Sequence, residues 1–404
     1  MIKTVIIGAG PSGITSAIFA QKKGEDVTII EGCEKPLKKL LLTGSGRCNY
    51  LNEDFNIKHY HGKNIELFKS LFTKENKDRL LNFFDSIGIE PLIINGYYYP
   101  YSNTSYAMYE ALLVEVNKRG IKLNLNEKLL DIALENNKFK LKTEKQVIIC
   151  DKLIISTGSK SFPKTGSDGS IFPLLEKLGH KVEFIYPSLV KLKTEEVFQK
   201  KWDGVRSIVK VSLYENNRKI KEEVGQIQFS KDGISGICIF NLSGYVNKGL
   251  KDGKDEQIRI DFMPFLDIDP LVWIENKNKK LYKRSISELL EGFLNYKIID
   301  IILNKSKIEK NSLLENLSQR EKEMLIKNLT EFEVDIKVPS EVYGAQVCGG
   351  GISLNEIDPR NMESKLVKNL YLTGEVIDIW GDCGGFNLAF AFLTGILTGS
   401  DIND

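Results

Sequence analysis

The chain has 404 residues, of which 42% are hydrophobic and 27% charged, a composition typical of a globular protein with two or three domains. Its 56 basic and 54 acidic residues leave a net charge of +2, so no strong field favours nucleic acid or a membrane surface. The six cysteines form no C-x-x-C pair, and no run of about 18 apolar residues occurs. We therefore expect a cytoplasmic protein without a metal, a nucleic-acid partner or a membrane span; the oligomeric state stays open.

The first thirty-one residues predict a nucleotide-binding βαβ unit. A β-branched strand, residues 3–7, leads into the loop Gly8–Gly13 and an apolar helix over residues 14–21, and a second strand ends on Glu31. The loop glycines allow a tight turn, close approach of the backbone to a pyrophosphate, and close helix–strand packing. The helix N-terminus favours phosphate, and Glu31 can accept from a ribose hydroxyl. The predicted contacts are Gly8, Gly10, Pro11, Ser12, Gly13 and Glu31.

The α/β pattern continues to about residue 190. A helix over residues 110–119 stops at Gly120, and alternating strands follow over residues 121–132, 139–143 and 147–149. A buried strand, residues 152–155, then runs into Thr157 and Gly158. These two residues are the second predicted cofactor contact, because parallel strands present their ligands at their carboxyl ends.

The pattern changes near Pro187. Short strands over residues 207–214, 225–229, 237–242 and 257–262 predict an inserted antiparallel sheet or barrel, residues 188–268. Residues 270–332 are helical and rich in lysine and glutamate, and they predict a small helical cap with a return strand, residues 269–340. Capping boxes are predicted at Ser285 with Glu288, Ser312 with Glu315, and Ser318 with Glu321.

The α/β pattern returns at the C-terminus. A strand over residues 368–372 enters Gly374 and Glu375, and Gly384-Gly385 opens a helix that reaches about Leu397. The nucleotide domain is therefore expected to be discontinuous, residues 1–187 and 341–404. Three strand-end glycine sites exceed what NAD needs and favour FAD, with Glu375 near the ribityl hydroxyls. The helix start at Gly385 would stabilise negative charge on reduced flavin.

These motifs resemble the HI0933-like flavoproteins of the YhiN/BaiN type, which belong to the glutathione-reductase-like superfamily. The resemblance covers nearly the whole chain, through residues 39–49, 163–167, 345–351, 370–378 and 384–389. It implies an α/β fold: a two-part Rossmann-like FAD-binding domain with an inserted antiparallel β-barrel or sheet and a small helical cap. It implies either amine oxidation of the aminoacetone type or NAD(P)H-dependent reduction of a conjugated ketone, with NADH or NADPH as a transient reductant. It adds Lys39, Arg47, Asn387, Leu388 and the backbone of Leu129 at the adenine to the FAD contacts.

Reactive side chains are less clearly marked. The glycine-rich loop that begins at Gly44 brings Cys48 near the cofactor, either as a reactive thiol or as a packing residue. Tyr99, in the run Tyr97–Tyr101, either donates a proton or belongs to an edge strand. His59 and His61 are expected in a surface loop and His180 in a structural role, and no acid–histidine cluster in the sequence supports a metal. Lys231 and Ile237 stand where the family usually has His and Pro, which puts the proton route in doubt.

The sequence thus favours an FAD-dependent oxidoreductase that acts on a small or medium organic substrate. Two alternatives stay open: a flavin-dependent RNA-modifying protein and a non-catalytic, redox-sensing flavoprotein. The balanced charge argues against the first, and the intact set of glycines argues against the second.

Overall fold

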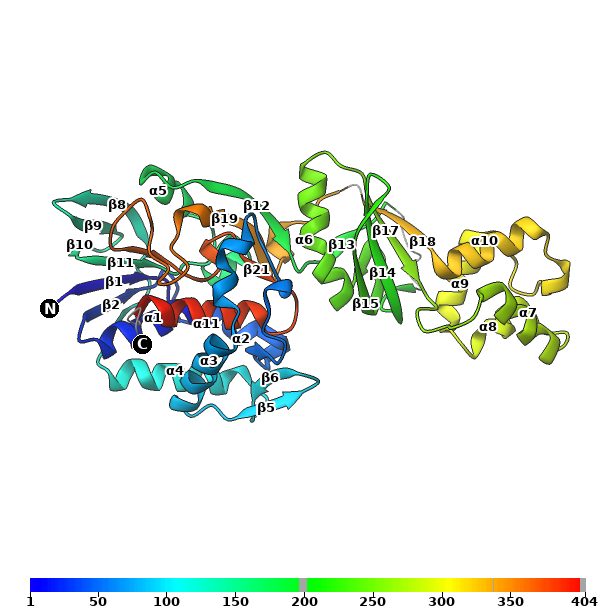
Figure 1. Ribbon diagram of the computed structural model, residues 1–404, viewed down its shortest axis with the longest axis horizontal. Helices are drawn as coiled ribbons and strands as arrows, with labels where there is room; N and C mark the ends of the chain where they lie inside the picture. Colours follow the sequence, from blue (N-terminus) through cyan, green and yellow to red (C-terminus); the bar gives the residue numbers. More distant parts are fainter. Residues whose placement is uncertain (196–201, 337, 400–404) are drawn as a thin grey trace. The chain divides into compact units, whose positions relative to one another are not determined.

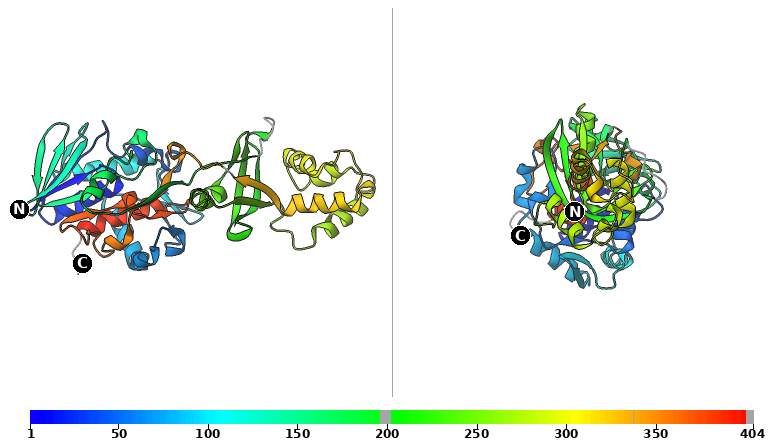
Figure 2. Two further views of the ribbon diagram at one scale, coloured as in Figure 1. Left: turned by 90° about the horizontal axis from the view of Figure 1, so that it is seen from above. Right: turned by 90° about the vertical axis from the view of Figure 1, so that its right-hand side faces the viewer.

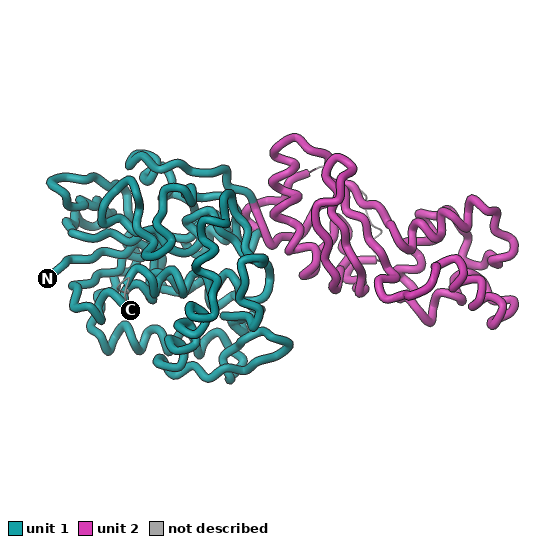
Figure 3. The backbone as a smooth tube through the Cα atoms, in the orientation of Figure 1, with its two compact units in different colours: residues 1–186, 345–404 teal, residues 187–344 magenta. Residues whose placement is uncertain are grey.

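The computed structural model describes residues 1–195, 202–336 and 338–399, and it divides into two compact units (Figure 3). Unit 1 comprises Met1–Tyr186 and Ala345–Asp404, and unit 2 comprises Pro187–Gly344. Each unit has its own hydrophobic core. The predicted fold class is confirmed: α/β, with a two-part Rossmann-like domain and an antiparallel insertion. The division of the insertion into residues 188–268 and 269–340 stays a prediction.

Unit 1 is built on a five-stranded parallel sheet with the order β20-β11-β1-β2-β7 (Figure 1). Its strands are rich in Val, Ile and Leu and are covered on both faces, as parallel strands require. Ile155 at the end of β11 pairs with Ile7 of β1 and with Leu372 of β20, so the C-terminal part of the chain joins the N-terminal sheet. The strands are β1 (Lys3–Ile7), β2 (Asp26–Ile30), β7 (Lys122–Asn124), β11 (Lys152–Ile155) and β20 (Leu370–Leu372).

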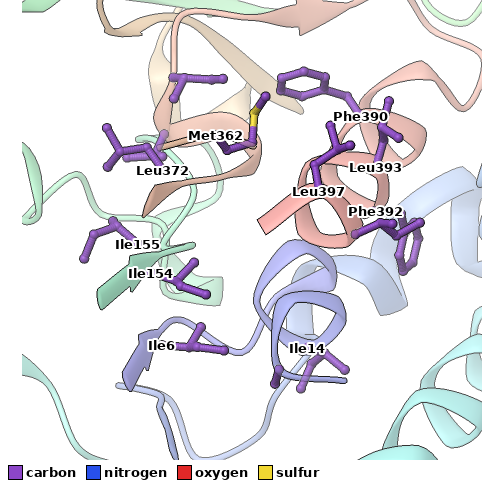
Figure 4. Close-up of a cluster of buried hydrophobic side chains, with 14 of the residues drawn as sticks. Ile6, Ile14, Ile154, Ile155, Met362, Leu372, Phe390, Phe392, Leu393 and Leu397 are labelled. Carbon is purple, nitrogen blue, oxygen red and sulfur yellow. The ribbon is translucent and has the colours of Figure 1, made fainter. Parts of the chain in front are cut away.

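Two helices pack together on one face of this sheet, α1 (Pro11–Lys22) and α11 (Phe386–Gly399) (Figures 1 and 4). Their backbones come very close, because a Cβ on Gly395 would lie 2.6 Å from the Ser12 carbonyl oxygen. The Thr398 hydroxyl donates to the Ser16 hydroxyl at 2.9 Å. A three-stranded antiparallel sheet lies on the other side of the parallel sheet (Figures 1 and 2), made of β8 (Leu129–Glu135), β9 (Lys138–Thr143) and β10 (Val147–Cys150).

Smaller elements complete unit 1. A three-stranded sheet is made of β3 (Leu51–Asn52), β6 (Tyr97–Pro100) and β5 (Pro91–Ile94). Two short pairs join β4 (Tyr60–His61) to β21 (Trp380–Gly381), and β12 (Val182–Ser188) to β19 (Val347–Ile352). The further helices are α2 (Lys38–Leu42), α3 (Lys74–Ser86), α4 (Ser105–Lys118) and α5 (Phe172–Lys177).

In its described residues, unit 2 contains five helices and a six-stranded antiparallel sheet with the order β13-β16-β15-β14-β17-β18. The strands are β13 (Leu192–Lys193), β14 (Arg206–Glu215), β15 (Arg218–Ser230), β16 (Gly233–Ser235), β17 (Glu256–Asp261) and β18 (Phe332–Ile336). Helix α6 (Ile237–Lys251) packs on β15. The others are α7 (Pro270–Lys280), α8 (Ile286–Glu291), α9 (Tyr296–Ser306) and α10 (Gln319–Thr330).

Two local predictions for unit 2 are wrong. Residues 237–242, predicted as a strand, form the first turns of α6, because a short apolar run fits a buried helix as well as a strand. The capping boxes at Ser285 and Ser318 are confirmed, but Ser312 caps nothing. The short 3-10 turn after it begins beyond Leu313, and the Glu315 carboxylate accepts from the Asn278 amide instead.

A buried carboxyl group lies at the start of β17. Glu256 is 3% exposed, and in the described structure neither of its carboxylate oxygens has a hydrogen-bond partner. It stands directly opposite Glu215 of β14. Burial, and then the charge of Glu215, raise the pKa of Glu256 to about 8, while Lys254 acts in the opposite direction. The carboxyl group is therefore protonated at neutral pH.

We predict that Glu256 makes the stability of the protein depend on pH. The folded-state pKa lies above the ordinary value of 4.5, so its stabilisation is fully present below about pH 4.5 and is lost as the pH rises through 8. At about 1.4 kcal/mol per pKa unit, the loss amounts to a few kcal/mol. Urea unfolding at pH 5 and pH 8 should show Glu256→Gln gaining stability relative to the parent at the higher pH. The exposed control Glu331→Gln should not. An equal parent–variant difference at both pH values would contradict the prediction.

Within the described ranges, no helix combines the length and the apolar character that a membrane crossing needs.

Candidate cofactor-binding site

The parallel sheet brings the predicted glycine sites to one edge. The loop Gly8–Gly13 follows β1, Glu31 follows β2, Thr157–Gly158 follows β11, and Gly374–Glu375 follows β20. Because these neighbouring strands run parallel, their carboxyl ends meet at the same edge. The hydroxyls of Ser156 and Thr373 lie 2.7 Å apart and join the ends of β11 and β20.

The three glycines of the loop differ in what the fold requires of them. A Cβ on Gly13 would lie 2.0 Å from the Gly8 carbonyl oxygen, and one on Gly8 would lie 2.5 Å from the Ser156 carbonyl oxygen. A Cβ on Gly10 would meet no described atom closer than that same oxygen, at 3.9 Å. Gly10 therefore leaves room at the N-terminus of α1, where the first N–H groups need acceptors from outside the helix. Pro11 and Ser12 begin that helix, and this cradle fits a pyrophosphate.

Glu31 is held by backbone donors. Its carboxylate accepts from the Ala9 N–H at 2.7 Å and from the Cys33 N–H at 2.8 Å. Two contacts leave acceptor capacity on a carboxylate, which suits ribose hydroxyls. The segment that leads to Leu129 lies beside Glu31, since the Glu127 N–H donates to the Glu31 carbonyl oxygen at 2.9 Å. The residues present therefore fit the adenosine half of FAD.

Lys39 and Glu375 meet each other. The Lys39 ammonium lies 2.6 Å from the Glu375 carboxylate and donates to the Ser161 hydroxyl at 2.6 Å. The Ser161 hydroxyl in turn donates to the Glu375 carboxylate at 2.6 Å, and the Cys348 N–H donates to the same carboxylate at 2.8 Å. Glu375 thus has partners within the protein on both oxygens, and its contact with a ribityl chain stays a proposal. Ser161 was not found by sequence reasoning, because no local pattern links it to a residue 214 positions away.

The loop after α2 has an unusual backbone. Gly44, Ser45, Gly46 and Cys48 all have φ between 56° and 84°, and Arg47 among them is right-handed. Only Gly46, Arg47 and Cys48 alternate in hand, and such an alternation directs successive N–H groups to one side, as in anion-binding loops. Arg47 is exposed, donates to the Gly44 carbonyl oxygen, and lies 4.9 Å over the ring of Tyr99.

The two reactive candidates are both buried. Cys48 is wholly buried, and burial raises the pKa of its thiol to about 12, which favours the packing interpretation. Tyr99 is 7% exposed, beneath Arg47. Its neighbour Tyr97 reaches the turn before α11, because a Cβ on Gly384 would lie 2.9 Å from its ring. The aromatic strand β6 therefore borders that turn.

The turn Gly381–Gly385 leads into α11. Gly384 and Gly385 have φ of 134° and 92°, and a Cβ on Gly385 would lie 2.7 Å from the Leu51 carbonyl oxygen. The Asn387 amide accepts from the Gly381 N–H and donates to the Gly381 carbonyl oxygen, both at 2.8 Å. Asn387 therefore braces the turn, and its contact with the cofactor stays a proposal, as does that of half-buried Leu388.

The prediction that His59 and His61 lie in a surface loop is wrong. His59 and His61 are half-buried, and both bind the carboxylate of Asp382, at 3.1 Å and 2.7 Å. Only the fold reveals this cluster, because more than 320 residues separate the partners. Within the described residues, no group of three or more His, Cys, Asp or Glu side chains could hold a metal ion. His180 lies buried between Glu356 and Ser364.

The two departures from the family pattern lie in unit 2. Lys231 lies in the turn between β15 and β16, and Ile237 is the first residue of α6. Ile237 is half exposed at 52%.

Known proteins resemble this chain over nearly its whole length. The family model described as HI0933-like protein Rossmann domain matches residues 2–401. A 3-dehydro-bile acid delta(4,6)-reductase of Clostridium scindens is 34% identical over 397 residues, which are 98% of this chain and 97% of the relative. A ribosomal RNA dihydrouridine synthase of Escherichia coli is 25% identical over 403 residues, 98% and 97% of the two chains. The open form of a flavocytochrome c3 fumarate reductase matches with a TM-score of 0.50 at 14% identity, over 98% of this chain and 77% of that one, a likeness of fold alone.

Proposed function

The chain belongs to the HI0933-like protein Rossmann domain family, as its motifs predicted, and from this premise we propose that it reduces a conjugated ketone in a hydrophobic ring system. It is an FAD-dependent oxidoreductase that acts on a small or medium organic substrate. The finer assignment rests chiefly on 34% identity, along the whole chain, to a reductase of 3-dehydro-bile acids.

The aromatic strand beside the α11 turn supports this substrate class. Tyr97 and Tyr99 share one face of β6, because residues two apart in a strand point the same way. Tyr97 borders Gly384, and the Arg47 guanidinium lies over Tyr99. The half-buried ring of Tyr97 offers apolar surface, and the exposed Arg47 guanidinium suits an acidic group on the substrate.

The residues of unit 1 hold the cofactor and set the electrostatics of the reaction. The backbone at Gly10 and the start of α1 would bind the pyrophosphate, and Glu31 would accept from the ribose hydroxyls. The N-terminus of α11 would stabilise negative charge on a reduced flavin bound beside it. When bound, FAD supplies the hydride chemistry between a reduced nicotinamide nucleotide and the substrate. The protein supplies binding, orientation and the proton.

Anaerobic stopped-flow spectroscopy tests this proposal. The purified protein should release FAD on heating, and NADH or NADPH should bleach the bound flavin. A steroid with a 3-keto-4-ene should restore the oxidised spectrum, whereas the corresponding saturated ketone should not. Bleaching by a primary amine, with conjugated ketones leaving the reduced flavin unchanged, would establish amine oxidation and overturn the proposal.

A second candidate, reduction of uracil in ribosomal RNA, is favoured by a basic segment of unit 2. Residues 277–284 carry five cationic side chains and no acidic one, with Tyr282 74% exposed among them. In the part of the chain that the structure describes, Lys279, Lys280 and Lys283 form no ion pair. Cations interleaved with an exposed aromatic ring suit single-stranded nucleic acid. The uracil 5,6 double bond is conjugated to a carbonyl, so the same hydride chemistry would serve.

Binding of a ribosomal RNA fragment decides between the two candidates. If RNA is the substrate, Lys279→Glu with Lys280→Glu should weaken binding at least tenfold and reduce its dependence on salt. The expectation from net charge, that the protein has no nucleic-acid partner, stays a prediction. This candidate would be excluded if the parent and the double variant bound the RNA equally weakly and mass spectrometry found no dihydrouridine in the RNA.

A further inference from the structure

Two histidines, His59 and His61, share one buried carboxylate at the base of α11. We propose that Asp54, His59, Asp382 and His61 form a proton relay from solvent to the turn before α11, which supplies the proton for substrate reduction. This inference rests on the proposed function, because a conjugated double bond gains one proton for each hydride that it accepts.

The four groups form a continuous hydrogen-bonded chain. Asp54 lies 2.9 Å from His59 Nε2, and Asp382 lies 3.1 Å from His59 Nδ1. The other oxygen of Asp382 lies 2.7 Å from His61 Nε2. Each link is within hydrogen-bond distance, so a proton can pass along the chain without a gap.

Exposure falls from Asp54 through His59 to Asp382, and His61 is nearly as buried as Asp382. The side chain of Asp54 is 50% exposed and that of His59 is 23% exposed. Asp382 and His61 are 7% and 11% exposed. The chain therefore has one end in contact with water and the other inside the protein, as a relay requires and as a surface ion pair does not.

The backbone fixes the inner end of the chain beside the α11 turn. Strand β4 pairs with β21, so His61 stands opposite Trp380, and the Asp382 N–H donates to the His59 carbonyl oxygen at 2.9 Å. The ring of His59 stacks on Phe386, the first residue of α11, at 4.4 Å. The relay is thus attached to the turn Gly381–Gly385, where the cofactor edge is proposed to lie.

The surrounding charges keep the relay able to carry a proton near neutral pH. Burial lowers the pKa of His59, but the hydrogen bonds and charges of Asp382 and Asp54 outweigh it, so the pKa is raised overall. Lys58, on the same segment as His59, pairs with Asp54 at 2.6 Å. The buried hydroxyl of Tyr60 donates to the Phe386 carbonyl oxygen instead. His59 and His61 share one buried negative charge, so protonation of one disfavours protonation of the other.

Each histidine of the relay takes up one proton and releases one proton. His59 takes a proton at Nε2 and passes the one on Nδ1 to Asp382, and His61 takes it at Nε2 and releases the one on Nδ1. The substrate would gain that proton together with one hydride, which bound FAD would supply from a nicotinamide nucleotide. Solvent replaces the proton through Asp54.

Removal of the shared charge tests the relay. In Asp382→Asn, oxidation of reduced flavin by a conjugated ketone should be at least tenfold slower, and its rate should fall at lower pH than in the parent because the pKa of His59 drops. Flavin reduction by NADH or NADPH should be unchanged, since that step needs no proton from this chain. His61→Ala should lose the same step and regain it when imidazole is added. The control His180→Gln, which breaks a histidine–glutamate pair elsewhere in unit 1, should keep the parent profile.

A measurement on the apoprotein separates this inference from the proposed function. NMR titration of the imidazole rings should show coupled curves for His59 and His61 in the parent and independent curves in Asp382→Asn. Independent titration in the parent, or an unchanged pH profile in every variant, would overturn the relay. A parent that no ketone reoxidises would overturn the proposed function, and the NMR titration would still decide whether the two histidines share a proton.

Discussion

Replacing Gly10 with valine should abolish FAD binding and leave the fold intact. The pyrophosphate has to approach the backbone at this position, and a branched side chain would fill that space. Apart from Gly10 itself and its two chain neighbours, no described atom lies closer than 3.9 Å to a Cβ there, so the apoprotein has room for the added side chain. We expect affinity for FAD to fall by about three orders of magnitude, or about 4 kcal/mol. The loss of glycine at the N-cap should cost at most about 1 kcal/mol of stability.

Fluorescence titration of apoprotein with FAD, together with thermal unfolding of the same samples, measures both effects. Gly13→Val is the informative contrast, because its Cβ would lie 2.0 Å from the Gly8 carbonyl oxygen and the loop itself could not form. Loss of FAD in that variant would reflect a damaged fold. Unchanged affinity in a folded Gly10→Val protein would show that the loop does not bind a pyrophosphate.

Replacing Gly395 with valine should cost unit 1 much of its stability. Its Cβ would lie 2.6 Å from the Ser12 carbonyl oxygen and 2.8 Å from Thr15 Cβ, so α1 and α11 would have to separate. Overpacking against backbone atoms costs roughly 3 kcal/mol, at the upper end of the usual range. FAD affinity should also fall, because Ser12 lies in the loop that we propose binds the pyrophosphate.

Urea unfolding of the apoprotein measures this loss. Gly10→Val serves as the matched control, since it adds the same side chain to the same unit where there is room. An unchanged unfolding midpoint for Gly395→Val would mean that the two helices do not pack as closely as described.

The sequence predicted the parts of this protein that depend on local backbone chemistry. Gly8, Gly13 and Gly385 occupy positions where a Cβ would collide with nearby backbone. Only glycine fits there, so these positions can be recognised from the sequence. The strand residues 370–372 could be placed in the N-terminal sheet because a buried apolar run followed by Thr-Gly-Glu repeats the strand-end pattern.

What the sequence missed depends on long-range contact. The run at 237–242 has the apolar, β-branched character of a strand, and only its packing against β15 makes it helical. His59 and His61 look like loop residues until β4 pairs with β21 and brings Asp382 to both rings. Lys39 and Glu375 were each predicted as cofactor contacts, but their pairing with each other was not, because it joins the two distant parts of unit 1.

The strand order of unit 1 also determines when its parallel sheet can be completed during synthesis of the chain. β11 leaves the ribosome long before β20, its partner at the edge of the sheet, because the roughly 200 residues between them take about 10–40 s to synthesise. Until then the hydrogen-bonding edge of β11 has no strand beside it, and α1 lacks the glycine-lined face of α11. A nascent chain of this protein therefore passes through an interval in which it cannot complete the core of unit 1, and in which an exposed strand edge invites aggregation.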